Sequence, residues 1–290
     1  MVQVDSIHVR DLALTRCTAP AILRRMEAFV SPGHEEAPRH NSRLVTEVGE
    51  DSATGQALMR YFAAMSQALG PMHWWPAKTP FEVIVGAILT QNTSWANVER
   101  AIANLRSAQM LTAPAIAAAR LSRLAILVRP SGYFRQKAKK LKSFVRFLQR
   151  DYGGSLKRMF DTPTGILRGK LLSVHGIGPE TADSILLYAG NHPVFVVDAY
   201  THRIFGRHGI TDGKLDYEGV RALFEAALPR DSQLFNEFHA LIVNTGKNWC
   251  RKNEPRCGEC PLGSLLPATS PLSQFHVAAR ETRLNQGTPP

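Results

Sequence analysis

The segment from Thr79 to Gln91, TPFEVIVGAILTQ, constrains the fold more than any other part of the sequence. Thr79 can act as a helix N-cap, Pro80 suits the first helical position, and Glu82 follows three residues after the cap. The body of the segment is apolar nearly all round a helical wheel, which is the pattern of a helix inside a protein core. The sequence therefore predicts a buried helix that starts at Pro80.

Most of residues 56–262 have the spacing of apolar residues that is typical of helices. Besides the buried helix, this spacing occurs in NVERAIANLRSA, APAIAAARLSRLAILV, RQKAKKLKSFVRFLQRDY and YEGVRALFEAAL. The run PVFVVD at residues 193–198 has the composition of a strand, but no partner strand is predicted nearby, so we interpret it as a turn into the next helix. We predict an all-α fold.

The two ends of the chain differ from this helical region. Residues 1–55 are interpreted as an N-terminal extension, with a helix at TAPAILRRMEAFV and a turn-rich linker at SPGHEEAPRHNSR. Residues 267–290 are rich in Pro, Ser and Thr and are expected to form a loose tail. No apolar run approaches the roughly 20 residues of a membrane span, and the N-terminus lacks the apolar core of a signal peptide. We therefore expect a cytoplasmic protein without a membrane partner.

The charge of the chain is strongly positive and unevenly distributed. The 290 residues include 35 Lys and Arg against 24 Asp and Glu, which gives a net charge of +11. Residues Arg129–Lys170, called the basic segment below, contain twelve Lys and Arg against Asp151 and Asp161, a local balance of +10. Such a concentration is typical of a protein that binds a polyanion, most often a nucleic acid. The alternative is a solvated basic helix face.

Three of the four cysteines lie close together. Cys250, Cys257 and Cys260 fall within eleven residues, whereas Cys17 stands apart. Without an export signal, such a cluster favours a metal site over disulfide bonds.

A short glycine turn separates two helical runs, PTGILRGKLLSV and ETADSILLYAG. The glycines permit a tight turn and the close approach of a ligand to the main chain, and Ile177 would anchor the turn in the core. Free N–H groups at the start of the second helix form an anion site, which suits a DNA phosphate. An ordinary helix–helix turn is the alternative. The residues predicted to contact phosphate are His175, Gly176, Ile177, Gly178, Glu180 and Thr181.

This turn, its following helix and VFVVDAYTHRIFGRHG closely resemble the helix-hairpin-helix DNA glycosylase superfamily, whose best-known member is endonuclease III. The resemblance extends from about His73 to Leu262 and includes FEVIVGAILTQNTSWANVERAI and HALIVNTGKNWCRKNEPRCGECP. It implies a two-part fold: a six-helix barrel at residues 80–190, and a second helical domain from residues 56–79 and 191–266 that carries the cysteines. The active site is then expected in the groove between them, and the expected partner is double-stranded DNA with a damaged base, bound by a monomer.

The resemblance also assigns a catalytic acid. Asp198 matches the family's catalytic aspartate, and a carboxylate suits the reaction because breaking an N-glycosidic bond builds positive charge on the sugar. Endonuclease III has a lysine in the helix after the hairpin that forms a Schiff base, and the matching residue here is Glu180. Because a carboxylate cannot be that nucleophile, we expect a monofunctional glycosylase. The adenine-excising branch is disfavoured, since its catalytic glutamate matches Gly86.

Two adjacent tryptophans precede the buried helix. Trp74 and Trp75 could form a stacking wall for a flipped base, or they could pack in the core. Aromatic faces bind a cationic base especially well, and this arrangement together with Glu180 resembles 3-methyladenine glycosylases of the endonuclease III type. Gln91 and Asn92 match the side chains that fill the gap left by the flipped base, and a polar helix end is their alternative role.

The cysteine loop resembles the family's iron–sulfur loop, which has the spacing C-x6-C-x2-C-x5-C. Cys250, Cys257 and Cys260 hold the first three positions, but Leu266 holds the fourth and cannot bind iron. Either another ligand, such as Cys17, a histidine or a small molecule, completes a [4Fe–4S] site, or the loop folds without a cluster. We favour the second alternative.

The function predicted from these residues is base excision repair by a DNA glycosylase that removes an alkylated purine. One alternative is a bifunctional, endonuclease III-like glycosylase and lyase that acts on oxidised pyrimidines, and Glu180 argues against it. Another is a DNA-structure binder without catalysis, and Asp198 argues against that.

Overall fold

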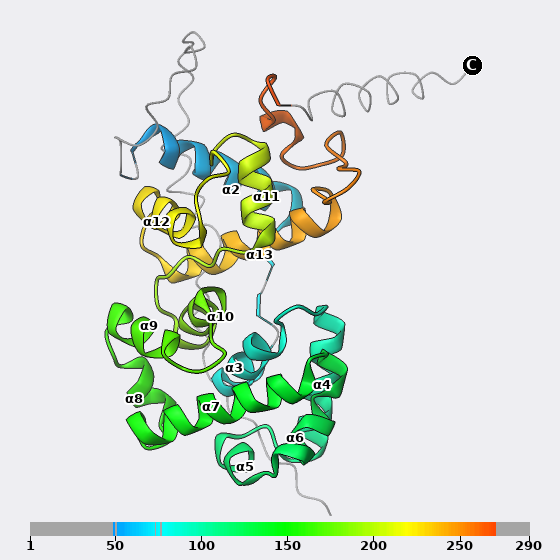
Figure 1. Cartoon of the computed structure of the whole chain (residues 1–290). Helices are drawn as coiled ribbons and strands as arrows, with labels where there is room; N and C mark the ends of the chain where they lie inside the picture. Colours follow the sequence, from blue (N-terminus) through cyan, green and yellow to red (C-terminus); the bar gives the residue numbers. More distant parts are fainter. Residues whose placement is uncertain (1–48, 50, 73, 76, 271–290) are drawn as a thin grey trace, which may run out of the picture. The chain divides into compact units, whose positions relative to one another are not determined.

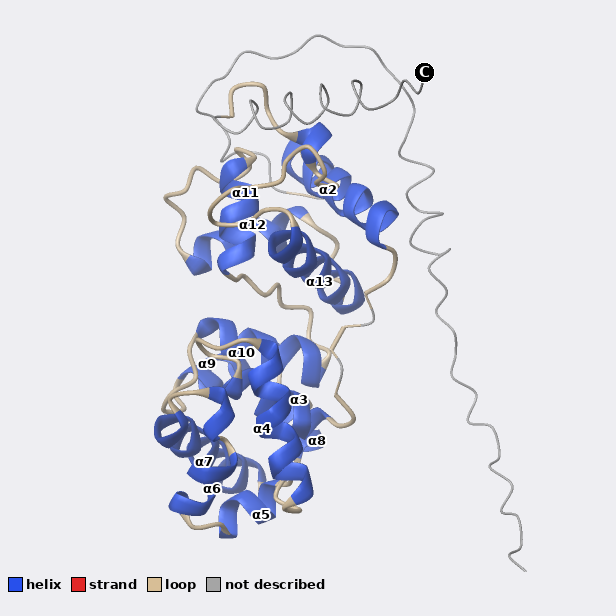
Figure 2. Ribbon diagram, turned by 90° about the vertical axis from the view of Figure 1, so that its right-hand side faces the viewer, coloured by secondary structure: helices blue, strands red, loops and turns tan. Residues whose placement is uncertain are grey.

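The computed structural model describes residue 49 and residues 51–72, 74–75 and 77–270. Within these residues the regular elements are helices and none is a strand, which confirms the predicted all-α fold (Figures 1 and 2). No helix in this part of the chain is both long and apolar enough to cross a lipid bilayer. The predicted N-terminal helix, its linker and Cys17 lie outside the described residues, as do residues 271–290 of the predicted tail.

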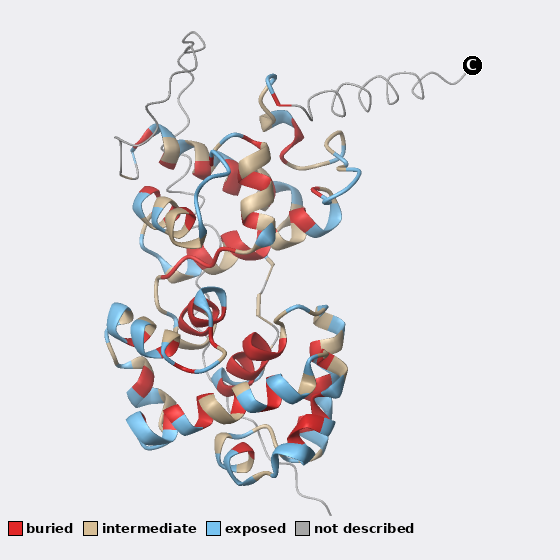
Figure 3. Cartoon of the chain, viewed as in Figure 1, coloured by how far each residue is buried: buried red, intermediate tan, exposed pale blue. Residues whose placement is uncertain are grey.

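Helix α3 (Pro80–Leu89) is the predicted buried helix. Thr79 is its N-cap, and the Oγ1 atom of Thr79 accepts a hydrogen bond of 3.2 Å from the backbone N–H of Glu82. Every residue from Phe81 to Leu89 is buried (Figure 3). The carboxylate of Glu82 does not return to the cap but forms an ion pair of 2.6 Å with Arg106 on helix α4 (Trp95–Ser107). A carboxylate buried this deeply requires such a partner.

The segment predicted to form the barrel contains α3, α4 and a series of further helices. Their buried apolar side chains form one cluster, which extends along the chain from Phe81 to Val194. The further elements are α5 (Ala113–Ala118), α6 (Leu121–Leu127), the 3₁₀ turn η1 (Arg129–Ser131), α7 (Phe134–Tyr152), α8 (Leu156–Phe160), α9 (Thr164–Leu172), α10 (Pro179–Ser184) and the π-helical turn η2 (Ile185–Ala189).

Residues 113–128, which have helical spacing in the sequence, form two helices. The chain turns to an extended conformation at Ala119 and Arg120, which have ψ values of 142° and 137°, so that α5 and α6 are separate helices. Both helices pack on α7. Helix propensity is a weak preference that tertiary packing overrides, and a break here lets both short apolar faces reach the same long helix.

The remaining helices surround a core rich in phenylalanine. They are α2 (Ala53–Leu69), α11 (Ala199–Arg207), α12 (Tyr217–Ala227), α13 (Ser232–Asn248) and the 3₁₀ turn η3 (Gly263–Leu265). The ring of Phe224 lies 4.2 Å from that of Phe195 and 4.9 Å from that of Phe205, measured between centroids. Helix α2 packs against α12 and α13, although these elements are far apart in the sequence (Figure 1).

Residues 193–198 contain no strand, as predicted. The side chains of Val194, Phe195, Val196 and Val197 are all buried, and the segment leads directly into α11. Burial of four consecutive apolar side chains fixes the backbone immediately before Asp198.

Candidate active site

Asp198 lies at the junction between this buried segment and helix α11. It is the N-cap of α11, and its Oδ1 atom accepts hydrogen bonds from the backbone N–H (2.8 Å) and the hydroxyl (3.0 Å) of Thr201. Its Oδ2 atom lies 3.7 Å from Nε2 of His239 on α13. One oxygen therefore caps the helix while the other is directed away from the cap, so that the same carboxylate can serve the helix and a reaction.

Glu180 is the second residue of α10, immediately after the glycine turn. The surrounding protein desolvates its carboxyl, and together with the negative charge of Asp198 this raises the pKa of Glu180 to about 7. The residue keeps an exposed surface, where water screens part of this effect, so we use the upward direction of the shift. Two carboxyls that interact in this way do not both ionise freely near neutral pH.

Tyr188 and His239 complete the group around Asp198, and the sequence analysis did not identify either of them. The hydroxyl of Tyr188 lies 2.5 Å from Nδ1 of His239. Burial first, then the charges of Asp198 and Glu180, raise the pKa of Tyr188 well above its usual range. Tyr188 belongs to the π-helical turn η2, and π turns within helices are frequent at functional sites. A lone histidine in the apolar run FHALIV was the only sequence signal for His239.

Trp75 connects this group to α3. Its ring lies 5.0 Å from the ring of Tyr188 and 5.0 Å from that of Trp95. A Cβ atom added to Gly86 would lie 3.2 Å from Cζ2 of Trp75, so the glycine leaves room for the indole. The structure thus brings Trp75 next to Tyr188, whereas the ring of Trp74 lies 5.9 Å from the ring of Trp75.

The glycine turn has the conformation that its sequence requires. Gly176 has a φ of +88°, and a Cβ there would lie 2.3 Å from Cγ of Lys140 on α7. Ile177 is buried, as the anchoring interpretation requires, and Gly178 has open space around its Cα. Among the other predicted phosphate contacts, His175 and Glu180 are exposed and Thr181 is buried. Phosphate contact by the turn therefore stays a prediction, for which His175, Gly178 and Glu180 are the exposed residues.

Gln91 and Asn92, the predicted wedge residues, lie in different surroundings. The side-chain amide of Gln91 donates to the carbonyl of Gly176 (3.1 Å) and to Oγ1 of Thr181 (2.9 Å), and Lys140 donates to Gln91 Oε1. The side chain of Gln91 is thus hydrogen-bonded to the glycine turn. Asn92 is exposed and has a φ of +53°, so it projects from a tight turn after α3.

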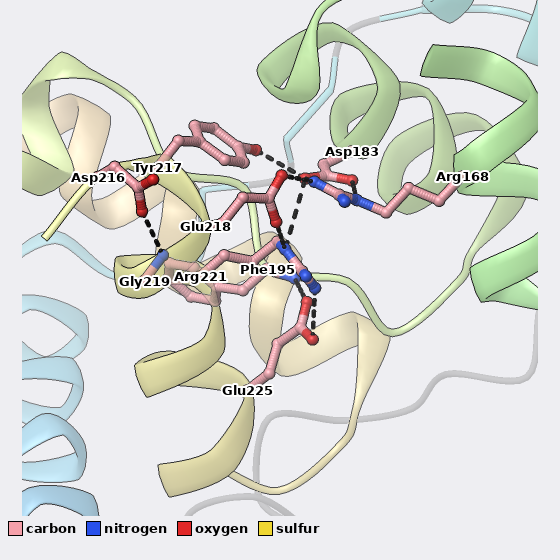
Figure 4. A network of polar contacts seen from close by, with 9 residues as sticks. All are labelled: Arg168, Asp183, Phe195, Asp216, Tyr217, Glu218, Gly219, Arg221 and Glu225. Atoms are coloured by element: carbon pink, nitrogen blue, oxygen red, sulfur yellow. Dashed lines mark hydrogen bonds and ion pairs between the residues drawn. The ribbon is translucent and has the colours of Figure 1, made fainter. Parts of the chain in front are cut away.

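A buried network connects α10 to α12 (Figure 4). Asp183 is completely buried and accepts hydrogen bonds from Nε (2.7 Å) and Nη2 (3.0 Å) of Arg168 and from the hydroxyl of Tyr217 (2.8 Å). Arg168 also binds Glu218 at 2.6 Å. Because Asp183 lies one turn after Glu180, these contacts fix the helix that carries Glu180.

The same network reaches the segment before Asp198. Arg221 forms ion pairs with Glu218 (3.0 Å) and Glu225 (2.8 Å). The Oε1 atom of Glu225 accepts a hydrogen bond of 3.0 Å from the backbone N–H of Phe195. Helix α12 therefore holds both the helix of Glu180 and the segment that ends at Asp198, and it fixes the two carboxyls relative to each other.

Part of the basic segment is occupied by internal contacts. Lys137 is buried and donates to the carbonyls of Leu89 (2.9 Å) and Ser131 (2.5 Å), and Arg168 belongs to the network above. Other cations of the basic segment form ion pairs at the surface. Exposed cations that remain on α7 are Arg135, Lys139 and Arg146.

Cys250, Cys257 and Cys260 line one cavity, and Leu266 lines it as well. The donor set is one sulfur short of the four thiolates that a [4Fe–4S] cluster takes. Within the residues that the structure describes, no group of three or more His, Cys, Asp or Glu side chains is arranged to hold a metal ion. The cysteine loop therefore supplies three of the four thiolate ligands of such a cluster.

The loop has other contacts that hold it. Arg207 on α11 donates to the carbonyls of Arg251 (2.6 Å) and Lys252 (2.8 Å), and its Nη1 atom lies 3.3 Å from Sγ of Cys250. Arg203 donates to the carbonyl of Cys250 at 2.7 Å. Two arginines thus satisfy carbonyl groups at the start of the loop.

Comparison with known proteins places this geometry in context. The family model described as HhH-GPD superfamily base excision DNA repair protein matches residues 85–230. A Methanocaldococcus jannaschii protein that is assigned as a DNA repair glycosylase is 45% identical over 208 residues, which cover 71% of this chain and 94% of that protein. Endonuclease III of Thermotoga maritima is 30% identical over 181 residues, which cover 62% of this chain and 79% of that enzyme.

A solved structure agrees with these relatives. The H. pylori 3-methyladenine DNA glycosylase (MagIII), solved with 1,N6-ethenoadenine bound, superposes with a TM-score of 0.59 and 31% identity. The superposition covers 66% of this chain and 97% of that chain.

Proposed function

Since the chain belongs to the HhH-GPD superfamily of base excision DNA repair proteins, it is a DNA glycosylase, and we propose that it releases alkylated purines such as 3-methyladenine and leaves the DNA strand uncut. The observation that carries this proposal is the pair formed by Asp198 and Glu180. Both side chains are carboxyls, and the charges that shift the pKa values of Glu180, Tyr188 and His239 come from carboxylates.

The absence of an amine from this set supports the monofunctional mechanism. A glycosylase that also cuts the strand needs an amine to form a Schiff base with the sugar. Glu180 occupies the position where that lysine is expected and cannot form an imine. We therefore propose that water, rather than a lysine, attacks the sugar.

The proposed reaction breaks the bond between the base nitrogen and C1′, and its electron pair leaves with the base. Positive charge develops on the sugar, and the carboxylate of Asp198 stabilises it. Water then adds to C1′, and its proton passes to Asp198. The product is an abasic site in an unbroken strand.

The charges and rings at the site favour a cationic base. The rings of Trp75 and Tyr188 place aromatic groups here, and Asp198 and Glu180 supply negative charge nearby. A 3-alkylated adenine in DNA is cationic and is already an activated leaving group. The 31% identity to the H. pylori enzyme, which is named for 3-methyladenine, agrees with this class of substrate.

The alternative is an endonuclease III-like enzyme that removes oxidised pyrimidines and cuts the strand, as the similarity to the Thermotoga enzyme would allow. One experiment separates the two proposals. The protein is incubated with alkylated and with oxidised duplex DNA, the released bases are identified, and the DNA is analysed with and without hot alkali. We expect free 3-methyladenine and breaks only after alkali. Release of oxidised pyrimidines with covalent trapping by borohydride would establish the alternative.

We further propose that the protein acts as a monomer in the cytoplasm, and that the cysteine loop works without an iron–sulfur cluster. Leu266 at the fourth ligand position and the bonds from Arg203 and Arg207 support the second proposal.

A further inference from the structure

His239 lies between Tyr188 and Asp198 and is contacted on both ring nitrogens. Its Nδ1 atom is 2.5 Å from the hydroxyl of Tyr188, and its Nε2 atom is 3.7 Å from Oδ2 of Asp198. The residue is 6% exposed, and Nε2 is buried without a hydrogen-bond partner among the described residues. A buried polar atom without a hydrogen-bond partner destabilises the folded protein. Such atoms are therefore rare, and a functional role is one reason why a protein keeps one.

The contacts decide which ring nitrogen of His239 carries the proton. Tyr188 keeps its hydroxyl proton because burial and the nearby carboxylates raise its pKa, so it acts as the donor to Nδ1. The described residues offer no second acceptor for that hydroxyl. With Nδ1 as an acceptor, the proton lies on Nε2 and points towards Asp198. The opposite tautomer would direct a lone pair at a carboxylate oxygen inside the protein.

Burial also favours the neutral form of the imidazole. Burial lowers the pKa of His239, and the charge of Asp198 opposes this only in part. The titratable groups that face it are Tyr188 from η2 and Asp198 from the start of α11, with Glu180 of α10 acting on both. Its own helix carries Glu237, whose carboxylate instead accepts a hydrogen bond from the backbone N–H of Met72. A neutral N–H donor favours an anionic carboxylate without cancelling its charge.

We propose that His239 is a positioning residue for catalysis: with its tautomer set by Tyr188, it presents Nε2–H to Oδ2 of Asp198 and holds this carboxyl in the ionised and oriented form that base release requires. A hydrogen bond from Thr201 fixes Oδ1 of Asp198, and Oδ2 faces Nε2 of His239 at 3.7 Å. The consequence is a division of roles between the two carboxyls. Glu180, whose pKa is raised, is the carboxyl of the pair that takes up a proton near neutral pH. This inference rests on Asp198 as the catalytic group of the proposed function.

The first test needs no substrate. The imidazole nitrogens of the ¹⁵N-histidine-labelled free protein are observed by NMR, and His239 is assigned by comparison with His239→Gln. We expect the neutral Nε2–H tautomer at pH 7, and a mixture of tautomers in Tyr188→Phe. A proton on Nδ1 of the parent protein, or an imidazolium at pH 7, would overturn the proposal whichever base the enzyme removes.

The second test is kinetic and uses a matched pair of variants. Glutamine can place an amide N–H where Nε2 lies, whereas the shorter asparagine cannot reach Asp198. In single-turnover reactions on DNA that contains 3-methyladenine, we expect His239→Asn to lose about a hundredfold in base release, as for loss of one positioned donor, and His239→Gln to retain most of it. Both should bind abasic DNA like the parent.

The pH profile separates this role from simple packing. Removal of the N–H donor makes the carboxyl pair hold its proton more tightly, so the pH of half-maximal base release should be higher for His239→Asn than for the parent. An unchanged profile, or equal losses of melting temperature, DNA binding and activity in both variants, would make His239 a core residue only. If the parent releases no alkylated base, the proposed substrate is wrong, and the NMR result still decides the role of His239.

Discussion

The ring of Trp75 lies 5.0 Å from the ring of Tyr188, and Tyr188 in turn contacts His239, which faces Asp198. This contact joins the loop before α3 to the group around Asp198. The two tryptophans also differ in their surroundings. Trp75 packs against Gly86, Trp95 and Tyr188, whereas the ring contact of Trp74 is with Trp75. The two residues should therefore respond differently to truncation.

Replacement of Trp74 by Ala should cost about 1–3 kcal/mol of base stacking, roughly a ten- to hundredfold loss in excision of 3-methyladenine. Melting temperature and binding to abasic DNA should change little. Replacement of Trp75 by Ala should also lower the free energy of unfolding by about 3 kcal/mol, because it leaves a cavity beside Gly86. Urea unfolding and single-turnover excision check both variants. Normal excision by both would remove the tryptophans from the site.

Asp198→Asn should abolish base release and preserve DNA binding. Asparagine still caps α11, since its amide oxygen can accept the bond from Thr201, but it lacks the charge that stabilises the developing cation. Base release should fall by at least about a hundredfold at an unchanged melting temperature. Thr201→Ala is the matched control, because it removes a bond to Oδ1 and keeps the charge. Similar rates for Asp198→Asn and the parent would exclude Asp198 from the mechanism.

The two glycines of the turn provide another matched pair. Gly176→Ala places a Cβ at a φ of +88° and 2.3 Å from Cγ of Lys140, so we expect it to lower the free energy of unfolding by about 1–2 kcal/mol. Gly178→Ala meets nothing within 4 Å and should leave stability unchanged. Affinity for undamaged duplex should fall in Gly176→Ala. Equal stability of the two variants would show that the turn tolerates a side chain at either position.

Because of Lys137, the free energy of unfolding should depend on pH in the alkaline range. Burial, and then the charge of Lys140, lower its pKa to about 8, while an unfolded lysine has a pKa of about 10.4. Between these values the unfolded chain binds the proton more tightly than the folded protein does. The contribution of Lys137 to the free energy of unfolding therefore rises from pH 8 to pH 10.4, by up to roughly 3 kcal/mol.

Urea unfolding at pH 7, 8.5 and 10 checks this expectation. The difference between the parent and Lys137→Met should grow with pH, whereas the exposed neighbour variant Lys139→Met should follow the parent. Parallel curves for the parent and Lys137→Met would contradict the shifted pKa.

The cysteine loop should be stable without iron. The purified protein should contain far fewer than four irons per chain, and a chelator should not change its melting temperature. Replacement of the three cysteines by Ser should have a small effect, whereas Arg207→Ala should cost about 1 kcal/mol because it removes the hydrogen bonds to the carbonyls of Arg251 and Lys252. A stoichiometric cluster, lost together with stability in the cysteine variant, would refute this proposal.

The sequence alone determined the features that depend on neighbouring residues. The cap at Thr79 and Pro80 set the start of α3, and its all-round apolar pattern required burial. Positive φ at Gly176 follows from a turn that only glycine tolerates well, and the apolar run 193–197 indicated the fixed approach to Asp198. These features are local, because a hydrogen-bonding cap, a backbone angle or a helical period involves residues within a few positions of each other.

Contacts between distant segments were decided only by the tertiary structure. His239 and Tyr188 are 51 residues apart in the chain, and a single histidine or tyrosine in an apolar helix gives no sign of its partner. The break at Ala119, the burial of Lys137 and the bonds of Gln91 to the glycine turn have the same origin. Each depends on which helices pack together, and that choice is made by the free energy of burying apolar surface over the whole core, which no short pattern of residues records.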